Sequence, residues 1–149
     1  MGEPALGFRV LGLHDLSHAI THAAHAFKHN LHDALHKASL EVAGRAKFYI
    51  RGKRRTNPPE LLGVVTGRLR QSITGRVEQR GPYTVGVVGP QRVTYAAIHE
   101  FGGSSTFHGR AVYIPPRPYL APALRDMEPR INSLLDGAVA QIVTDIVED

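Results

Sequence analysis

The order of predicted elements along the chain (helix, hairpin, strand, helix) predicts an α+β fold. It should have a long N-terminal helix, a small antiparallel β-sheet made of a hairpin plus a third strand, and a C-terminal helix. Apolar residues recur at helical spacing near both ends, and short stretches in the middle alternate between apolar and polar residues. The 149 residues suffice for a single domain. We divide it into an N-terminal arm (1–13), a long helix (14–52), a β-rich body (66–115) and a C-terminal helix (118–147).

The first helix is predicted by apolar residues at intervals of four, four and three, which follow the helical period closely. Asp15 can cap its first turn, because a carboxylate accepts hydrogen bonds from the unpaired amides there, and Gly52 provides an end. At ~1.5 Å per residue this helix is longer than a globule of this size is wide, so we expect part of its apolar stripe to contact another chain. The stripe consists of Leu16, Ile20, Ala24, Phe27, Leu31, Leu35, Ala38, Val42, Ala46 and Tyr49.

The segment after this helix is predicted to be a loop over residues 53–67. Pro58 and Pro59 break any helix there. Thr66 is then expected to act as the N-cap of a short helical turn that runs to Ile73.

The β-rich body is predicted mainly from alternation. Residues 74–80 and 83–89 flank a Gly-Pro pair and are expected to form a half-buried antiparallel hairpin. A short helix or turn is expected at residues 93–101. We predict a flexible polar loop at 102–109 and a third strand at 111–114.

The C-terminal helix is predicted from Pro118 onward by a second apolar face. Pro122 is tolerable in the first turn, whereas Pro129 is expected to kink the helix or restart it. The face consists of Leu120, Leu124, Met127, Ile131, Leu134, Ala138, Ile142 and Ile146.

The charge of the chain is positive and unevenly placed. Eighteen Lys and Arg against thirteen Asp and Glu give a net charge of +5. Residues 45–80 hold ten basic and two acidic residues, whereas residues 126–149 hold six acidic residues and one basic residue. Such a chain can bind nucleic acid, or it can stack on copies of itself with basic ends against acidic ends.

Composition excludes several classes of site and partner. The chain has no Cys, so disulfides, thiolate metal sites and cysteine nucleophiles are excluded. Its apolar runs are far shorter than a membrane span, and its first residues show no signal-peptide pattern, so we expect no membrane partner.

Seven of the nine histidines form a row along the first helix. Each precedes a residue of the apolar side by two positions, which is about 200° of helix rotation, so the row lies on the opposite face. It can be a solvated or inter-subunit polar face, or a metal-binding strip, since His pairs at i and i+4 chelate Zn²⁺. No third ligand is evident beyond Asp33, so we expect no metal site. The row consists of His14, His18, His22, His25, His29, His32 and His36.

Catalytic patterns are incomplete in this sequence. His99 and Glu100 begin like a zincin motif, but Gly103 stands where the second His is required. There is no nucleophile elbow, phosphate-binding loop or dinucleotide fingerprint. Nothing brings Glu60, Glu78 and Glu100 together, and Glu100 is expected to pair with an Arg. We therefore expect no enzyme, no catalytic residue and no cofactor.

Three segments resemble, in order, signature blocks of bacteriophage minor tail components. Residues 66–73 (TGRLRQSI) resemble a TGxLRxSI block, and residues 95–102 (YAAIHEFG) resemble a YAxxxEFG block. Residues 116–123 (PRPYLAPA) resemble a PxRPFLxPA block, with a Tyr in the usual Phe position. The residues that carry the resemblance are Thr66, Gly67, Leu69, Ser72, Tyr95, Glu100, Phe101, Gly102, Pro116, Pro118, Tyr119 and Leu120.

The resemblance implies a neck or tail-completion protein of long-tailed phages, akin to the virion morphogenesis proteins of Mu-type phages. Such a protein is a structural part of the virion, assembled in the host cytoplasm. The resemblance implies a homo-oligomeric ring, expected to be a hexamer or dodecamer, that joins the head connector to the tail and lets DNA pass. Other neck, connector and tail-tube proteins would be its partners.

Five arginines are candidates for the subunit interface or the DNA channel: Arg54, Arg55, Arg68, Arg70 and Arg117. Guanidinium groups pair well with carboxylates and phosphates, and the two prolines beside Arg117 stiffen its backbone. Contact with DNA would be independent of base sequence. The rival hypothesis is a small basic nucleic-acid-binding module. A third possibility is a metal-dependent hydrolase that uses the histidine row.

Overall fold

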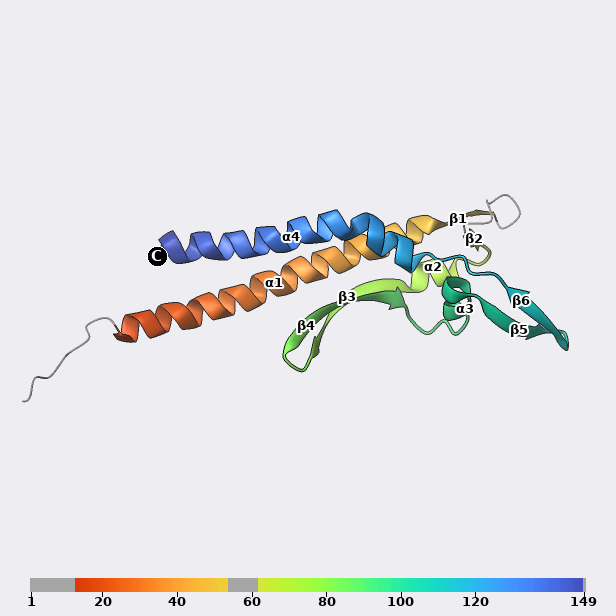
Figure 1. Cartoon of the computed structure of the whole chain (residues 1–149), viewed down its shortest axis with the longest axis horizontal. Coiled ribbons are helices and arrows are strands. Elements are labelled where there is room, and N and C mark those ends of the chain that lie inside the picture. Colours follow the sequence, from red (N-terminus) through yellow and green to blue (C-terminus); the bar gives the residue numbers. More distant parts are fainter. Residues whose placement is uncertain (1–12, 54–61, 149) are drawn as a thin grey trace, which may run out of the picture.

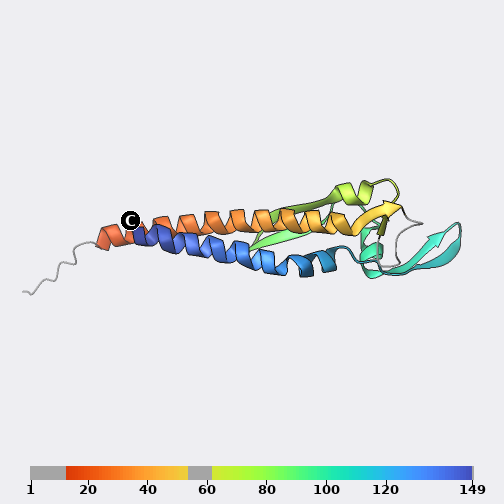
Figure 2. The ribbon, with the colours of Figure 1, turned by 90° about the horizontal axis from the view of Figure 1, so that it is seen from above.

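The computed structural model describes residues 13–53 and 62–148. Its two long helices, α1 (Leu13–Tyr49) and α4 (Leu120–Glu148), lie side by side and antiparallel, and together they form a two-helix arm (Figures 1 and 2). A β-hairpin lies along α1, and the remaining elements gather where α1 ends and α4 begins. The predicted α+β arrangement of helix, β-rich body and helix is confirmed.

The strands of the described ranges pair two by two into three separate sheets. The first pair is parallel and the other two are antiparallel hairpins: β1 (Ile50–Lys53) with β2 (Leu62–Val64), β3 (Ile73–Arg80) with β4 (Tyr83–Pro90), and β5 (Gly103–Phe107) with β6 (Arg110–Ile114). Two short helices connect them: α2 (Arg68–Ser72) and α3 (Ala96–Phe101).

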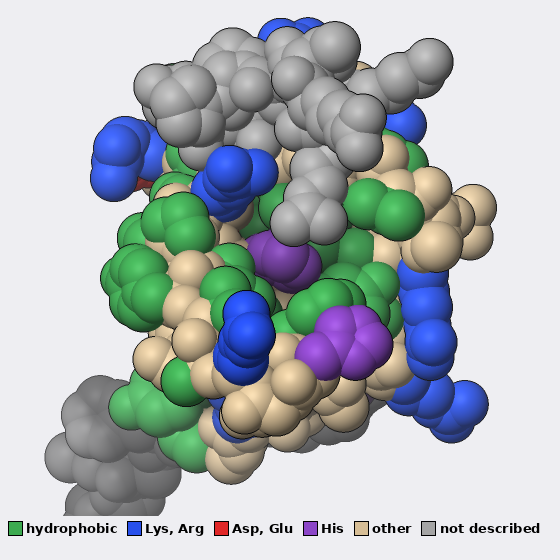
Figure 3. All heavy atoms as spheres, turned by 90° about the vertical axis from the view of Figure 1, so that its right-hand side faces the viewer, with side chains coloured by type: hydrophobic (Ala, Val, Ile, Leu, Met, Phe, Trp, Pro, Cys, Tyr) green, Lys and Arg blue, Asp and Glu red, His purple; other side chains and the backbone are tan. Residues whose placement is uncertain are grey.

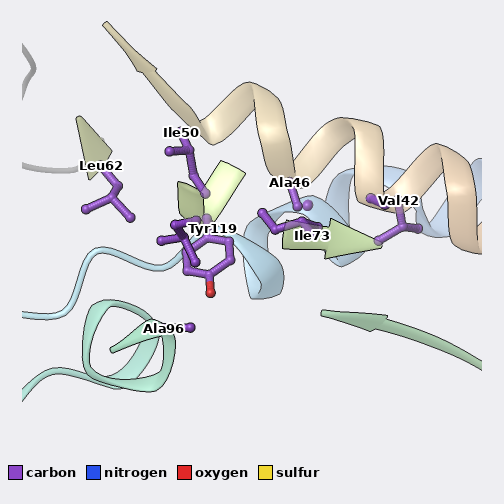
Figure 4. Close-up of a cluster of buried hydrophobic side chains, with 10 residues drawn as sticks. Val42, Ala46, Ile50, Leu62, Ile73, Ala96 and Tyr119 are labelled. Atoms are coloured by element: carbon purple, nitrogen blue, oxygen red, sulfur yellow. The ribbon is translucent and has the colours of Figure 1, made fainter. Parts of the chain in front are cut away.

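The hydrophobic core sits at the junction between the two-helix arm and the short elements. Figure 4 shows the ring of Tyr119 surrounded by side chains from α1, β1, β2, β3 and α3. Residues far apart in the sequence pack against one another there. This packing stabilises the junction because it removes apolar surface from water. The buried members of this cluster are Val42, Ala43, Ala46, Ile50, Leu62, Leu69, Ile73, Ala96, Tyr119 and Ala123.

The β3–β4 hairpin touches α1 backbone to backbone at Ser39. A Cβ atom built on Gly75 would lie 2.3 Å from the carbonyl oxygen of Ser39, and one built on Gly86 would lie 2.6 Å from the hydroxyl of Ser39. Only glycine allows strands to approach a helix this closely. These two glycines therefore set the distance between the hairpin and α1.

Two groups of polar contacts join α1 to α4. Asp126 accepts hydrogen bonds from Nε of Arg45 at 2.8 Å and from the hydroxyl of Tyr49 at 2.7 Å. Farther along the arm, Nε of Arg130 donates to Glu41 at 3.0 Å. Arg45 belongs to the basic segment 45–80, and its side chain is engaged within the chain.

Two predicted boundaries are wrong, and one of the two predicted effects of Pro129 is excluded. The first helix ends at Tyr49, because Ile50 turns into β1 and is buried in the core. Gly67, in the left-handed conformation, is the N-cap of α2, while the hydroxyl of Thr66 accepts a 3.3 Å hydrogen bond from the amide of Arg68. The helix α4 continues through Pro129 without a restart.

The predicted loop at residues 102–109 is also wrong, since most of it forms β5. Phe107 faces Arg110 across a two-residue turn in which His108 and Gly109 both have positive φ, the geometry that matches strand twist in a tight hairpin. The third predicted strand, β6, therefore pairs with β5 and does not extend the first hairpin. Within the described ranges, no helix is long and apolar enough to cross a membrane.

Candidate assembly site at the motif end

The three sequence blocks that resemble phage tail components meet at one end of the molecule, which we call the motif end. The first block forms α2 and its N-cap, the second forms α3, and the third leads into the first turn of α4. Leu69, Ala96 and Tyr119, one residue from each block, belong to the same buried cluster. The blocks are therefore held together by packing.

Glu100 connects the second block to the third through its carboxylate. The side chain is 6% exposed, and its oxygens accept hydrogen bonds from the backbone amides of Tyr119 at 2.8 Å, Leu120 at 3.0 Å and Ala121 at 2.9 Å. These amides begin α4, where a helix has unpaired donors and a positive dipole end. The expectation that Glu100 pairs with an Arg is wrong: its carboxylate caps α4.

Tyr119 lies beneath this cap, and its side chain is among the largest that are fully buried. Its hydroxyl has no hydrogen-bond partner among the described residues. Burial, together with the nearby Glu100 and Tyr95, raises the pKa of the hydroxyl to about 12. This residue therefore anchors the core.

The backbone on either side of Glu100 fixes where Arg117 stands. Gly102 has a φ of 73°, and a Cβ there would lie 2.9 Å from Cδ of Pro116. The amide of Arg117 donates a 2.7 Å hydrogen bond to the carbonyl of His99. Arg117 is thereby tied to α3, and its half-buried side chain lines a pocket.

This pocket, which we call the motif pocket, has a volume of about 380 Å³. Its lining comes from β1, β2, α2, α3, β6 and the segment before α4. Figure 3 views the motif end directly and shows apolar side chains around a hollow, with Lys or Arg side chains near its border. Three of the five candidate arginines, Arg68, Arg70 and Arg117, line it together. Arg54 and Arg55 lie outside the described residues.

Several large apolar side chains are exposed on the elements of the motif end, and two of them, Val65 and Tyr113, line the pocket. Val65 and Phe101 are 77% and 79% exposed. On the projecting β5–β6 hairpin, Phe107 and Tyr113 are 69% and 67% exposed. Single exposed apolar side chains are common on protein surfaces, whereas a cluster of large ones marks an interaction surface.

The sequence did not predict the residues that β2, β5 and β6 contribute to this surface. Leu62 and Val64 fell in a segment predicted to be a loop, and Phe107 fell in one predicted to be polar. A strand was predicted at residues 111–114, but no local signal showed that Val112 and Tyr113 would remain exposed. Tyr95, which lines the pocket, and Phe101, the last residue of α3, are both exposed.

The histidine row lies apart from the motif end. The described side chains of His22, His25, His29, His32 and His36 are all exposed. Nδ1 of His29 lies 3.4 Å from Asp33, and the rings of His32 and His36 stack with centroids 6.5 Å apart. Among the described residues, no three His, Asp or Glu side chains are arranged to hold a metal ion. The side chains of His14 and His18 lie outside the described ones.

Comparison with known families gives a match that covers the motif end. The model of the phage virion morphogenesis family matches residues 43–140, which include all three sequence blocks, the motif pocket and most of α4. No curated protein and no solved structure matches the chain. The matched range covers well over half of the 149 residues. The chain therefore belongs to the phage virion morphogenesis family, and it is a virion-associated protein with a structural or assembly role.

Proposed function

We propose that this protein is a structural subunit of the phage neck. It forms a homo-oligomeric ring between the head connector and the tail and lets DNA pass through the ring. The ring is built by contacts between different surfaces of neighbouring subunits and is closed by rotation. The subunit acts without catalysis. Family membership supports the virion role, and the surface of the two-helix arm supports self-association.

The observation that carries the ring is apolar surface left uncovered along the two-helix arm. In α1, Ile20 is 61% exposed and Phe27 is 44% exposed, although both lie on the apolar stripe. In α4, Val139 and Val143 are 47% and 58% exposed. Toward the motif end the same stripe is buried at Ala38, Val42 and Ala46. The chain therefore covers only part of its own stripe, and copies of the chain can cover the rest.

The test is the mass and shape of the purified full chain. We expect sedimentation velocity and electron microscopy to find a discrete ring. The double variant Ile20→Ser, Phe27→Ser should fall apart into monomers while keeping its helical circular dichroism. Tyr83→Ser is the matched control, because Tyr83 is 71% exposed at the tip of the β3–β4 hairpin, away from the arm. A parent chain that stays monomeric at high concentration, alone and with other virion proteins, would overturn the proposal.

The rival function, a small basic nucleic-acid-binding module, has a different signature. A monomer that bound duplex DNA tightly, with affinity falling steeply as salt rises, would favour it. In a ring, contact with passing DNA needs only exposed cations on the channel wall. Arg68 and Arg70, both exposed on α2, are the described candidates for such contact.

A further inference from the structure

The positive charge of the motif pocket favours a negatively charged ligand. Arg68, Arg70 and Arg117 line it, and no Asp or Glu stands among its described lining residues. The nearby carboxylate of Glu100 already accepts hydrogen bonds from three amides of α4 and is not among the residues that line the pocket. Guanidinium groups pair with carboxylates through directed, charge-assisted hydrogen bonds. A ligand that carries carboxylates is therefore favoured over a neutral or basic one.

The strands around the pocket select the shape of the ligand. All of β2 lines it, and so does the end of β6 from Val112 to Ile114. Each of these strands belongs to a two-stranded sheet in the described part of the chain, so each has one edge without a partner strand. The partner of β6, β5, contributes no lining residue, and the partner of β2 contributes only Ile50. The unpaired edges are thus the ones nearest the pocket.

Open strand edges accept an extended peptide as an added strand, because the main-chain groups of the edge still need partners. In an added strand, successive side chains point to opposite faces. Apolar side chains on one face would meet Leu62, Val64 and Ile114, and acidic side chains on the other would reach the arginines.

We propose that the motif pocket binds an extended segment of another virion protein in which apolar and acidic residues alternate, and that this segment adds to the open edge of β2 or β6. The inference rests on the proposed place of the chain among other virion proteins. It assigns self-association and partner docking to different surfaces. The two-helix arm contacts copies of this chain, and the motif pocket contacts the partner.

A display library of random linear decapeptides, selected on the full-length chain, tests the proposal. We expect enriched sequences that alternate apolar residues with Asp or Glu. A labelled peptide of the enriched type should bind in fluorescence anisotropy, and methylation of every second backbone amide should abolish binding. Hydrogen exchange at β2 or β6 should slow when the peptide is bound, because an added strand occupies the amides of one edge.

Variants separate the pocket from the rest of the surface. The double variant Arg70→Gln, Arg117→Gln should weaken binding by at least about tenfold, since two charge-assisted contacts are lost. Arg92→Asn is the matched control: it removes an exposed charge outside the lining residues and keeps a residue type that tolerates its φ of 55°. Its affinity should stay within about twofold of the parent, as expected for a surface charge away from the site.

Several outcomes would overturn the proposal. One is that no peptide is enriched. Another is that the selected peptides bind the double arginine variant as tightly as they bind the parent chain. A third is that the methylated peptide binds the parent chain as tightly as the unmethylated peptide does. If the pocket were occupied by a second copy of the chain, the peptide would dissociate the ring, and the partner would not be another virion protein. The arm variant Ile20→Ser, Phe27→Ser should lose the ring and keep peptide binding, so a failure of the ring and a failure of the pocket are distinguishable.

Discussion

The carboxylate of Glu100 accepts a 2.8 Å hydrogen bond from the backbone amide of Tyr119, the first of three consecutive amides that it binds at the start of α4. This contact joins two sequence blocks that are separated by the β5–β6 hairpin. It explains why an acidic residue is buried at the motif end although no described cation is paired with it. The cap makes the position of α4 depend on α3.

Replacing Glu100 should loosen the start of α4. Glu100→Ala leaves three amides without their acceptor, and we expect the free energy of unfolding to fall by about 3 kcal/mol, given the strength of hydrogen bonds to a charged group. Glu100→Gln keeps one carbonyl acceptor and should cost roughly half as much. Chemical denaturation measures both values. Hydrogen exchange in the first turn of α4 should accelerate more than in the β3–β4 hairpin.

Glu128→Gln is the control for this prediction. It removes an exposed carboxylate from the same helix, and its cost should stay within about 0.5 kcal/mol. If Glu100→Ala were as mild as this control, the carboxylate would not be what holds the start of α4.

Removing the hydroxyl of Tyr119 should not weaken the protein. The group is buried without a partner among the described residues, and an unsatisfied buried hydroxyl costs about 1–3 kcal/mol. Tyr119→Phe keeps the ring in the core, and we expect the free energy of unfolding to rise by about 1 kcal/mol. The change also restores the residue that the resembling sequence block usually carries. A loss of stability in denaturation experiments would show that the hydroxyl has a partner that stabilises the fold.

The parts of the fold that the sequence predicted are those with local signals. The spacing of the apolar residues from Leu16 to Tyr49 predicted α1, and alternation around Gly81 predicted the β3–β4 hairpin. Strand β5 has no such signal. Its residues 104–107 are exposed on both faces, so the sequence does not need the alternation of apolar and polar residues that marks a half-buried strand. The parallel pairing of Ile50 with Leu62 joins distant residues, and local propensity does not specify such a contact.

The candidate site was predictable only in part for the same reason. The sequence alone identified the three blocks and the charged candidates Arg68, Arg70 and Arg117, but no sequence feature predicted that these arginines would line one pocket. The role of Glu100 was missed because its amide partners lie 19 to 21 positions away. A cap supplied from another helix has no sequence spacing of its own, unlike a cap within one helix.

The contact between the β3–β4 hairpin and α1 should not tolerate a methyl group. A Cβ at residue 75 would lie 2.3 Å from a backbone oxygen of α1, which cannot move alone, so Gly75→Ala should cost about 3 kcal/mol as overpacking. Gly89→Ala is the matched control on the same hairpin, because nothing lies within 4 Å of its Cβ position. Thermal denaturation should show a clear drop for the first variant and almost none for the second.

A second pair of variants identifies which atom of Ser39 each glycine contacts. Gly86→Ala would meet the hydroxyl of Ser39, so adding Ser39→Ala should relieve much of its cost. The same addition should not rescue Gly75→Ala, whose contact is with the backbone. Equal rescue of both would contradict the proposed backbone contact.

The arm between α1 and α4 should lose stability in acid because of Asp126. The hydrogen bond from Tyr49, followed by that from Arg45, lowers the pKa of Asp126 below its ordinary value of 3.8. A group whose pKa is lower in the folded protein stabilises it above the unfolded value, and this contribution is lost as the pH falls through the folded value. The melting temperature of Asp126→Asn should therefore be lower than that of the parent at neutral pH. This difference should stay constant down to about pH 5 and shrink below pH 3.8. A difference that disappeared between pH 7 and pH 5 would show that the variant acts through a group other than the Asp126 carboxylate.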